Sequence, residues 1–145
     1  MTISIQSAAY TGGVDYGSDV STFAGGNGLD PSFATITGPR VVAEALARRL
    51  MTPAGTMIGD PNYGYDLRAL INKRLTVADL YSVRSSIAAE LVKDERVQDV
   101  PTCDLTADTA TGTVSVTASV DLGQGPFALV LAVSAVTVQL LKVAS

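Results

Sequence analysis

The spacing of apolar residues changes once along this chain, from a helical period to strict alternation. Apolar residues first recur every three or four positions in two separate segments, and each stripe predicts an amphipathic helix. Gly38-Pro39 favours a helix start, and Thr52-Pro53 should end that helix near Met51. Thr76 and Asp79 resemble a capping box for the second helix. The stripes consist of Val42, Ala45, Leu46 and Leu50, and of Leu80, Val83, Ile87 and Leu91.

The residues between the two helices predict a compact corner rather than a long element. Ala54-Gly55 and Asp60-Pro61-Asn62 are typical of turns. Between these turns, residues 56–58 are long enough for one short strand. Residues 67–71 predict a second, short helical piece. We therefore expect a helix, turn, strand, turn and helix in quick succession.

After Arg96 the apolar residues alternate with polar ones, which predicts strands. We expect a strand over 97–107, with Pro101 restricting it to an edge or a bulge, and a turn over 108–112. The clearest strand follows over 113–122, where Val114, Val116, Ala118, Val120 and Leu122 share one face. Residues 127–141 predict one last strand, whose change of phase near Ser134 indicates a bulge or burial of both faces. Two helices followed by an antiparallel meander of about three strands make an α+β domain.

Residues 1–37 differ from the rest of the chain because no apolar period is sustained there. Glycine pairs and isolated aromatic residues occur among few charges. We interpret this segment as an extended arm that is ordered by what it lies against, and residues 38–145 as one domain. A terminus without a defined role is the alternative.

Composition restricts the function. The net charge is −4 and the ten Lys and Arg residues do not cluster, so we expect no nucleic-acid partner. Residues 127–141 are too short and too polar for a membrane span, and no secretion signal is expected. Cys103 is the single cysteine, interpreted as a small core residue rather than a nucleophile.

Catalytic chemistry has little support in the sequence. Histidine is absent, which removes the usual general base. Glu44 and Glu90 are expected to be solvated or capping carboxylates, and no spacing pairs them as a glycosidase requires. No cluster has metal-ligand or phosphate-loop spacing, so we expect no metal, no cofactor and no enzymatic activity.

An ordered series of residues around the corner resembles the signature of a known family. The series resembles that of the baseplate wedge and sheath-initiator proteins of contractile phage tails, which have been described as lysozyme-like and have a type VI secretion counterpart. The likeness extends from about Gly38 to the C-terminus. The matching residues are Arg49, Leu50, Thr52, Pro53, Gly55, Tyr63, Gly64, Asp66 and Leu67.

The resemblance implies a docking site at the end of the second long helix. Family members carry an acid-Pro-Arg triplet there, which docks on the bundle formed by the large baseplate wedge subunits. Here the triplet reads Asp94, Glu95 and Arg96, so Glu95 stands where proline is usual. Arginine suits such a joint because its planar fork can form two hydrogen bonds at once.

The resemblance also implies that the C-terminal sheet accepts arms of the sheath protein by β-strand addition. The protein would then be a virion structural protein, made in the host cytoplasm and present in six copies, whose arm reaches tail tube or hub proteins. A peptidoglycan hydrolase of the tail and a small adaptor with the same fold are the alternatives. The strand positions expected to pair with sheath are Thr113, Ser115, Thr117, Thr137 and Gln139.

Overall fold

A computed structural model describes residues 14–22, 30–71, 73–133 and 138–144. Two long helices, one short helix and a four-stranded antiparallel sheet make an α+β fold, which confirms the predicted class. The helices are α1 (Pro39–Met51), the short 3-10 helix η1 (Leu67–Leu70) and α2 (Val77–Val92). The sheet contains β3 (Asp99–Asp108), β4 (Thr113–Asp121), β5 (Pro126–Val133) and β6 (Val138–Ala144), while β1 (Ser18–Val20) and β2 (Thr35–Thr37) form a separate antiparallel pair.

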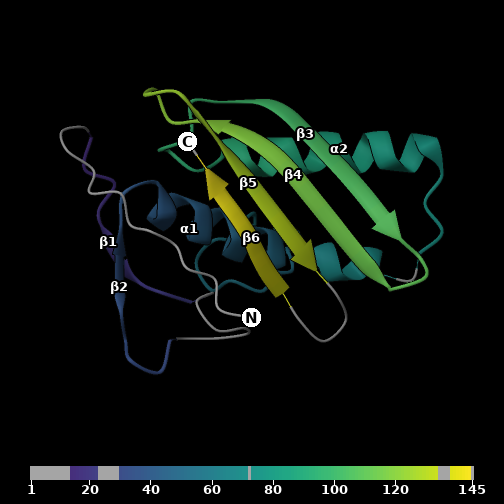
Figure 1. The fold of residues 1–145 in the computed structure, drawn as a ribbon. Helices are drawn as coiled ribbons and strands as arrows, with labels where there is room; N and C mark the ends of the chain where they lie inside the picture. Colours follow the sequence, from purple (N-terminus) through teal and green to yellow (C-terminus); the bar gives the residue numbers. More distant parts are fainter. Residues whose placement is uncertain (1–13, 23–29, 72, 134–137, 145) are drawn as a thin grey trace.

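Both long helices lie on the same face of the sheet. In Figure 1, α2 lies behind β3 and α1 lies behind β5 and β6, and the residue contacts between these elements agree. The strands follow one another in the order β3-β4-β5-β6, so each pairs with its neighbour in sequence. This is the predicted meander.

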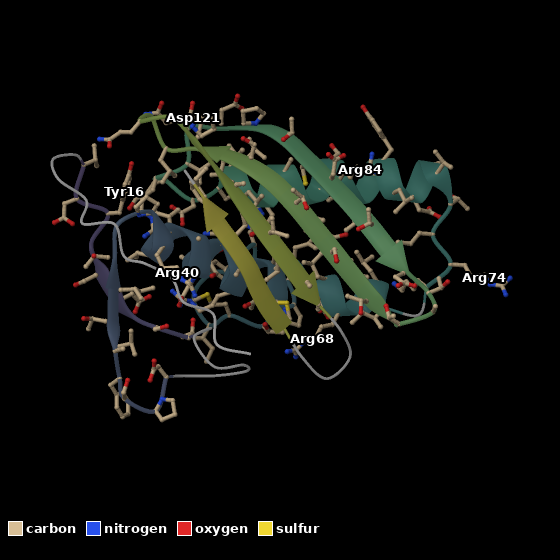
Figure 2. The ribbon with its side chains drawn as sticks, viewed as in Figure 1. Tyr16, Arg40, Arg68, Arg74, Arg84 and Asp121 are labelled. Atoms are coloured by element: carbon tan, nitrogen blue, oxygen red, sulfur yellow. The ribbon has the colours of Figure 1, made fainter. Side chains whose placement is uncertain are left out.

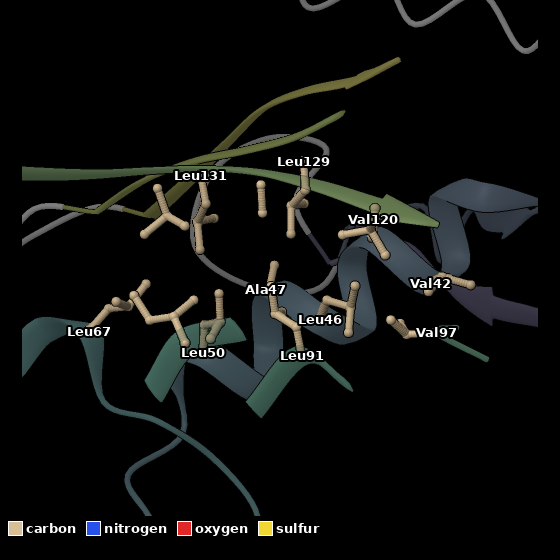
Figure 3. Packing of buried hydrophobic residues seen from close by; sticks show 14 of the residues in the cluster. Val42, Leu46, Ala47, Leu50, Leu67, Leu91, Val97, Val120, Leu129 and Leu131 are labelled. Atoms are coloured by element: carbon tan, nitrogen blue, oxygen red, sulfur yellow. The ribbon is translucent and has the colours of Figure 1, made fainter. Parts of the chain in front are cut away.

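The core fills the space between the helices and the sheet (Figure 3). Alternate residues of β4 and β5 point inward because successive side chains of a strand project to opposite faces. They meet the stripes of α1 and α2, as the sequence pattern predicts. Fully buried members of the core include Val42, Leu46, Leu50, Ile87, Leu91, Val116, Val120, Leu129 and Leu131.

The helix ends follow the local chemistry of the sequence. Gly38 caps α1 at φ 68°, with Pro39 at the first helical position. In α2 the Thr76 side chain accepts from the Asp79 amide, and the Asp79 carboxylate accepts from the Thr76 amide, which confirms the capping box. Pro101 lies on an edge strand beside a register shift, as predicted.

The single last strand expected over 127–141 is instead two antiparallel strands, β5 and β6. Leu131 pairs with Leu140 and Val133 with Val138, so the chain reverses between them. The change of phase in the sequence therefore marks a change of strand rather than a bulge near Ser134, which itself lies outside the described residues. The sheet gains a fourth strand as a result.

Residues 56–58, expected as a short strand, form turns. The Thr56 amide donates to the Pro53 carbonyl at 3.3 Å, the Asp60 amide to Met57 at 3.4 Å, and the Tyr63 amide to Asp60 at 3.2 Å. A three-residue extended run would have no partner strand here to satisfy its backbone groups, whereas successive turns satisfy some of them locally.

The described part of the N-terminal segment packs against the domain. Tyr16 is buried and belongs to the core cluster, and its hydroxyl donates to the Leu122 carbonyl at 3.5 Å. Figure 2 shows Tyr16 and Asp121 toward the same end of the molecule. Strands β1 and β2, which the sequence pattern did not predict, pair in register from Ser18–Thr37 to Val20–Thr35.

Candidate functional site

Glu90 binds the corner between α1 and η1 to α2. Only 4% of its surface is exposed. Its carboxylate accepts from Arg49 Nη1 at 3.0 Å, from the Gly64 amide at 2.8 Å and from Lys93 Nζ at 2.6 Å. Two groups that are distant in sequence, Arg49 and Gly64, and one that lies three residues away, Lys93, thus converge on one buried carboxylate.

The expectation that Glu90 is solvated is therefore wrong. Glu90 lies three residues after Ile87, which places it on the buried side of α2 beside Leu91. A polar residue at that place in an apolar stripe was the signal that sequence reasoning missed. Burial of a carboxylate needs compensating donors, and the corner supplies them.

The environment of Glu90 holds it in the charged form. Burial acts to raise its pKa, but the hydrogen bonds from Lys93, the Gly64 amide and Arg49 outweigh it, and the pKa lies below its usual value. A general acid in glycoside hydrolysis needs the opposite shift. Glu90 therefore holds structure together rather than donating a proton.

Gly64 and Tyr63 each make a specific contact in the corner. The backbone at Gly64 has φ 104°, and a Cβ atom there would lie 2.2 Å from the Thr52 carbonyl oxygen. Only glycine allows this approach. The Arg49 guanidinium lies 4.2 Å from the centre of the Tyr63 ring, so Arg49 binds the corner through both a cation–π contact and its ion pair with Glu90.

The other signature residues are divided between the core, the helix ends and the surface. Leu50 and Leu67 are fully buried. The Thr52 hydroxyl donates to the Arg48 carbonyl at 2.8 Å, and the Asp66 carboxylate caps η1 by accepting from the Arg68 amide at 3.1 Å. Pro53 and Gly55 lie in exposed turns. Most of the signature thus builds one corner.

Glu44 of α1 is a second buried carboxylate, and it binds the N-terminal segment. It accepts from Arg40 Nε at 2.7 Å, and from the amide and hydroxyl of Thr22 at 2.8 and 2.9 Å. Arg48, one turn later, pairs with Asp19 at 2.6 Å. The expectation of a solvated Glu44 is also wrong, because the segment that covers it comes from outside the helical pattern.

The triplet Asp94, Glu95 and Arg96 lies directly after α2. Arg96 donates through Nε and Nη2 to the two oxygens of Asp94, at 2.9 and 2.7 Å. Asp94 is 8% exposed and Glu95 is exposed. Burial acts to raise the Asp94 pKa, but the hydrogen bonds and charge of Arg96 outweigh it and lower the pKa. Asp94 thus fixes the guanidinium in place. The Nη1 group of Arg96 takes no part in this two-bond contact.

An open hollow of about 600 Å³ lies beside the triplet. It is lined by residues 15–17 of the N-terminal segment, by Arg49 and Lys93, and by the triplet itself. The predicted docking residues therefore lie beside the signature corner and the N-terminal segment. The sequence alone did not link these three parts.

The strand positions predicted to pair with sheath fall on two different strands. Thr113, Ser115 and Thr117 lie on β4, which is paired with β3 on one side and β5 on the other. Their backbone groups already serve the sheet, so β4 cannot accept an incoming strand. Gln139 lies on the edge strand β6, opposite Ala132, and Thr137 lies outside the described residues.

Other chemical sites find no support in the part of the chain that the structure describes. No group of three acidic, histidine or cysteine residues is arranged to hold a metal ion there. Cys103 is half-buried, and burial together with nearby Asp104 raises the pKa of its thiol. Among the same residues, no helix has the length and apolar character to cross a membrane.

Comparison with known proteins adds no family: no family model matches the chain, and no curated protein matches its sequence. The family resemblance therefore remains a proposal.

Proposed function

We propose that this chain is a structural subunit of a contractile-tail baseplate wedge. It docks on the large wedge subunits through Asp94, Glu95 and Arg96, and its sheet accepts a strand of the sheath protein, so that the first sheath ring copies its register. The observation that carries this proposal is a sheet with helices on one face and a strand, β6, at its edge. An edge strand presents backbone donors and acceptors that a partner strand can satisfy.

Of the two edge strands, β6 is the better acceptor. Strand β3 contains Pro101, which lacks an amide donor, and a register irregularity between Asp99 and Thr102. Both features are typical of edges protected against pairing. Strand β6 contains no proline or glycine and one charged residue, Lys142. We therefore assign the sheath-pairing role to β6 and not to β4.

The docking role rests on the geometry around Arg96. Because Asp94 fixes the guanidinium plane, little side-chain entropy remains to be lost on binding. The neighbouring hollow gives a partner segment room beside the triplet. Glu95, in the position of the usual proline, is exposed and does not disrupt the turn, since the Val97 amide still donates to the Asp94 carbonyl at 2.9 Å.

A peptidoglycan hydrolase is the main alternative class, and it is separated by a direct assay. Both buried carboxylates accept hydrogen bonds from cationic side chains, and the pKa of Glu90 is lowered. We expect no clearing of peptidoglycan in a zymogram. Clearing that disappears in a Glu90→Gln variant would favour the hydrolase.

Strand addition is tested with proline substitutions at two successive positions of β6, Gln139→Pro and Leu140→Pro. Successive amides of an edge strand point alternately toward the sheet and away from it. One variant should disturb the pairing with β5, whereas the other should fold, join wedges and fail to seed sheath. Ser115→Pro in the central strand β4 is the control and should unfold the domain.

The measurement is sheath assembly on wedges reconstituted with each variant, followed by electron microscopy. A folded proline variant that seeds sheath as well as the unmodified protein would contradict strand addition at β6. Failure of the unmodified protein to copurify with wedge and sheath proteins would contradict the proposed function itself.

A further inference from the structure

The loop between α1 and η1 exposes an apolar tip. All ten residues from 53 to 62 are exposed. Ile58 at the tip is fully exposed, and about half of the Met57 surface is accessible. Single exposed apolar residues are common on proteins, so the tip becomes informative only through the rest of the loop.

The loop is stiff in spite of its exposure. Besides the turn hydrogen bonds described above, the Thr56 hydroxyl donates to the Pro53 carbonyl at 2.7 Å, and the Asn62 amide donates to the Asp60 carboxylate at 3.1 Å. Gly55 and Gly59 take left-handed conformations, at φ 82° and 94°, that permit the tight turns. A tip held in one conformation loses little entropy when it binds.

The base of the loop is attached to the end of α2, next to the docking triplet. Lys93 Nζ donates to the Asn62 carbonyl at 2.9 Å and also pairs with Glu90. The Gly64 amide, two residues further on, binds the same carboxylate. Since Lys93 lines the hollow together with the triplet, the loop base and the proposed docking surface are continuous.

We propose that Met57 and Ile58 form an apolar anchor that inserts into an apolar pocket of the wedge subunit bound by the triplet. This inference rests on the proposed function and adds a second, apolar contact to it. Charge argues against a lipid surface, because Asp60 is the only charged residue from 53 to 62 and no Lys or Arg occurs between positions 50 and 67. Continuity with the triplet argues for the same protein partner.

The test compares variants of two highly exposed apolar residues, Ile58→Ser in the loop and Val77→Ser at the start of α2. Val77 is 85% exposed and lies outside the docking surface. Affinity for the purified wedge subunits is measured by calorimetry. We expect Ile58→Ser to bind about 10- to 100-fold more weakly, which corresponds to one apolar side chain left unburied. Val77→Ser should bind as the unmodified protein does, and both variants should keep its melting temperature.

The outcomes separate the anchor from the proposed function. If the unmodified protein does not bind wedge subunits, both proposals fail. If it binds and Ile58→Ser binds equally well, only the anchor is refuted. Equal weakening by both variants would indicate general surface hydrophobicity and also refute it. The anchor is also refuted if Ile58→Ser abolishes self-association or binding to anionic lipid vesicles while its affinity for the wedge subunits is unchanged.

Discussion

Replacing Glu90 by alanine should destabilise the whole domain. The carboxylate is the acceptor for Arg49 Nη1 and for the buried Gly64 amide. Alanine leaves both donors without this acceptor at a position where Glu90 itself is only 4% exposed. The Arg49 side chain is itself only 13% exposed, so its charge cannot be solvated freely.

The expected loss can be worked from these contacts. Removing one partner of a buried ion pair typically costs about 3–5 kcal/mol, because the other charge remains buried. The Lys93 contact adds little, since that side chain is about half exposed and can turn to water. Domains are stable by only about 5–15 kcal/mol, so the loss is a large share of the total. At this chain length it corresponds to a fall in melting temperature of about 10 to 20 °C.

Urea denaturation followed by circular dichroism measures this loss directly. Glu95→Ala is the matched control, because Glu95 is an exposed glutamate five residues away and should change stability by less than about 0.5 kcal/mol. Glu90→Gln should fall between the two, since it can still accept from the Gly64 amide. An unfolding midpoint of Glu90→Ala equal to that of the control would refute the role assigned to Glu90.

Two further predictions test the same corner and the triplet. Gly64→Ala should destabilise the domain by more than Gly55→Ala does in urea denaturation. An alanine at either left-handed position costs about 1–2 kcal/mol, but only a Cβ at Gly64 also meets the Thr52 carbonyl. Equal losses of stability in the two variants would exclude the clash. The pKa of Asp94 is lowered in the folded protein. Its contribution to the unfolding free energy is therefore complete above its unfolded pKa of about 3.9, and it is lost as the pH falls through the pKa of the folded protein. The unfolding free energy of Asp94→Asn should therefore fall less between pH 5 and pH 2 than that of the unmodified protein, and parallel curves would count against the Arg96 pair.

The elements that could be predicted from sequence are those fixed by their own residues. Helix α1 begins at Pro39 and α2 follows the Thr76 capping box because these effects act within one helical turn. The alternation of apolar and polar residues in β4 correctly predicts which face is buried, because successive side chains of a strand point to opposite faces of the sheet. Sequence reasoning therefore found the class of fold and most element boundaries.

The features that escaped prediction depend on contacts between distant residues. The pairing of Leu131 with Leu140 makes two strands of one apolar run, and no single-strand pattern reveals where the chain reverses. For the same reason, an alternating strand such as β4 looks alike at a sheet edge and in its middle. The triplet Asp94, Glu95 and Arg96 follows α2 as expected, but its own ion pair and the adjoining hollow were not foreseen.

The two buried glutamates explain how irregular parts of this chain are held without regular secondary structure. Glu44 on α1 accepts from the Thr22 amide, and Glu90 on α2 accepts from the Gly64 amide. Each carboxylate thus satisfies a backbone donor that has no strand or helix partner, and an arginine balances its charge. A carboxylate used in this way is already occupied by structural partners. The same arrangement therefore holds both the corner and the N-terminal segment against the helices through contacts that no local sequence pattern supplies.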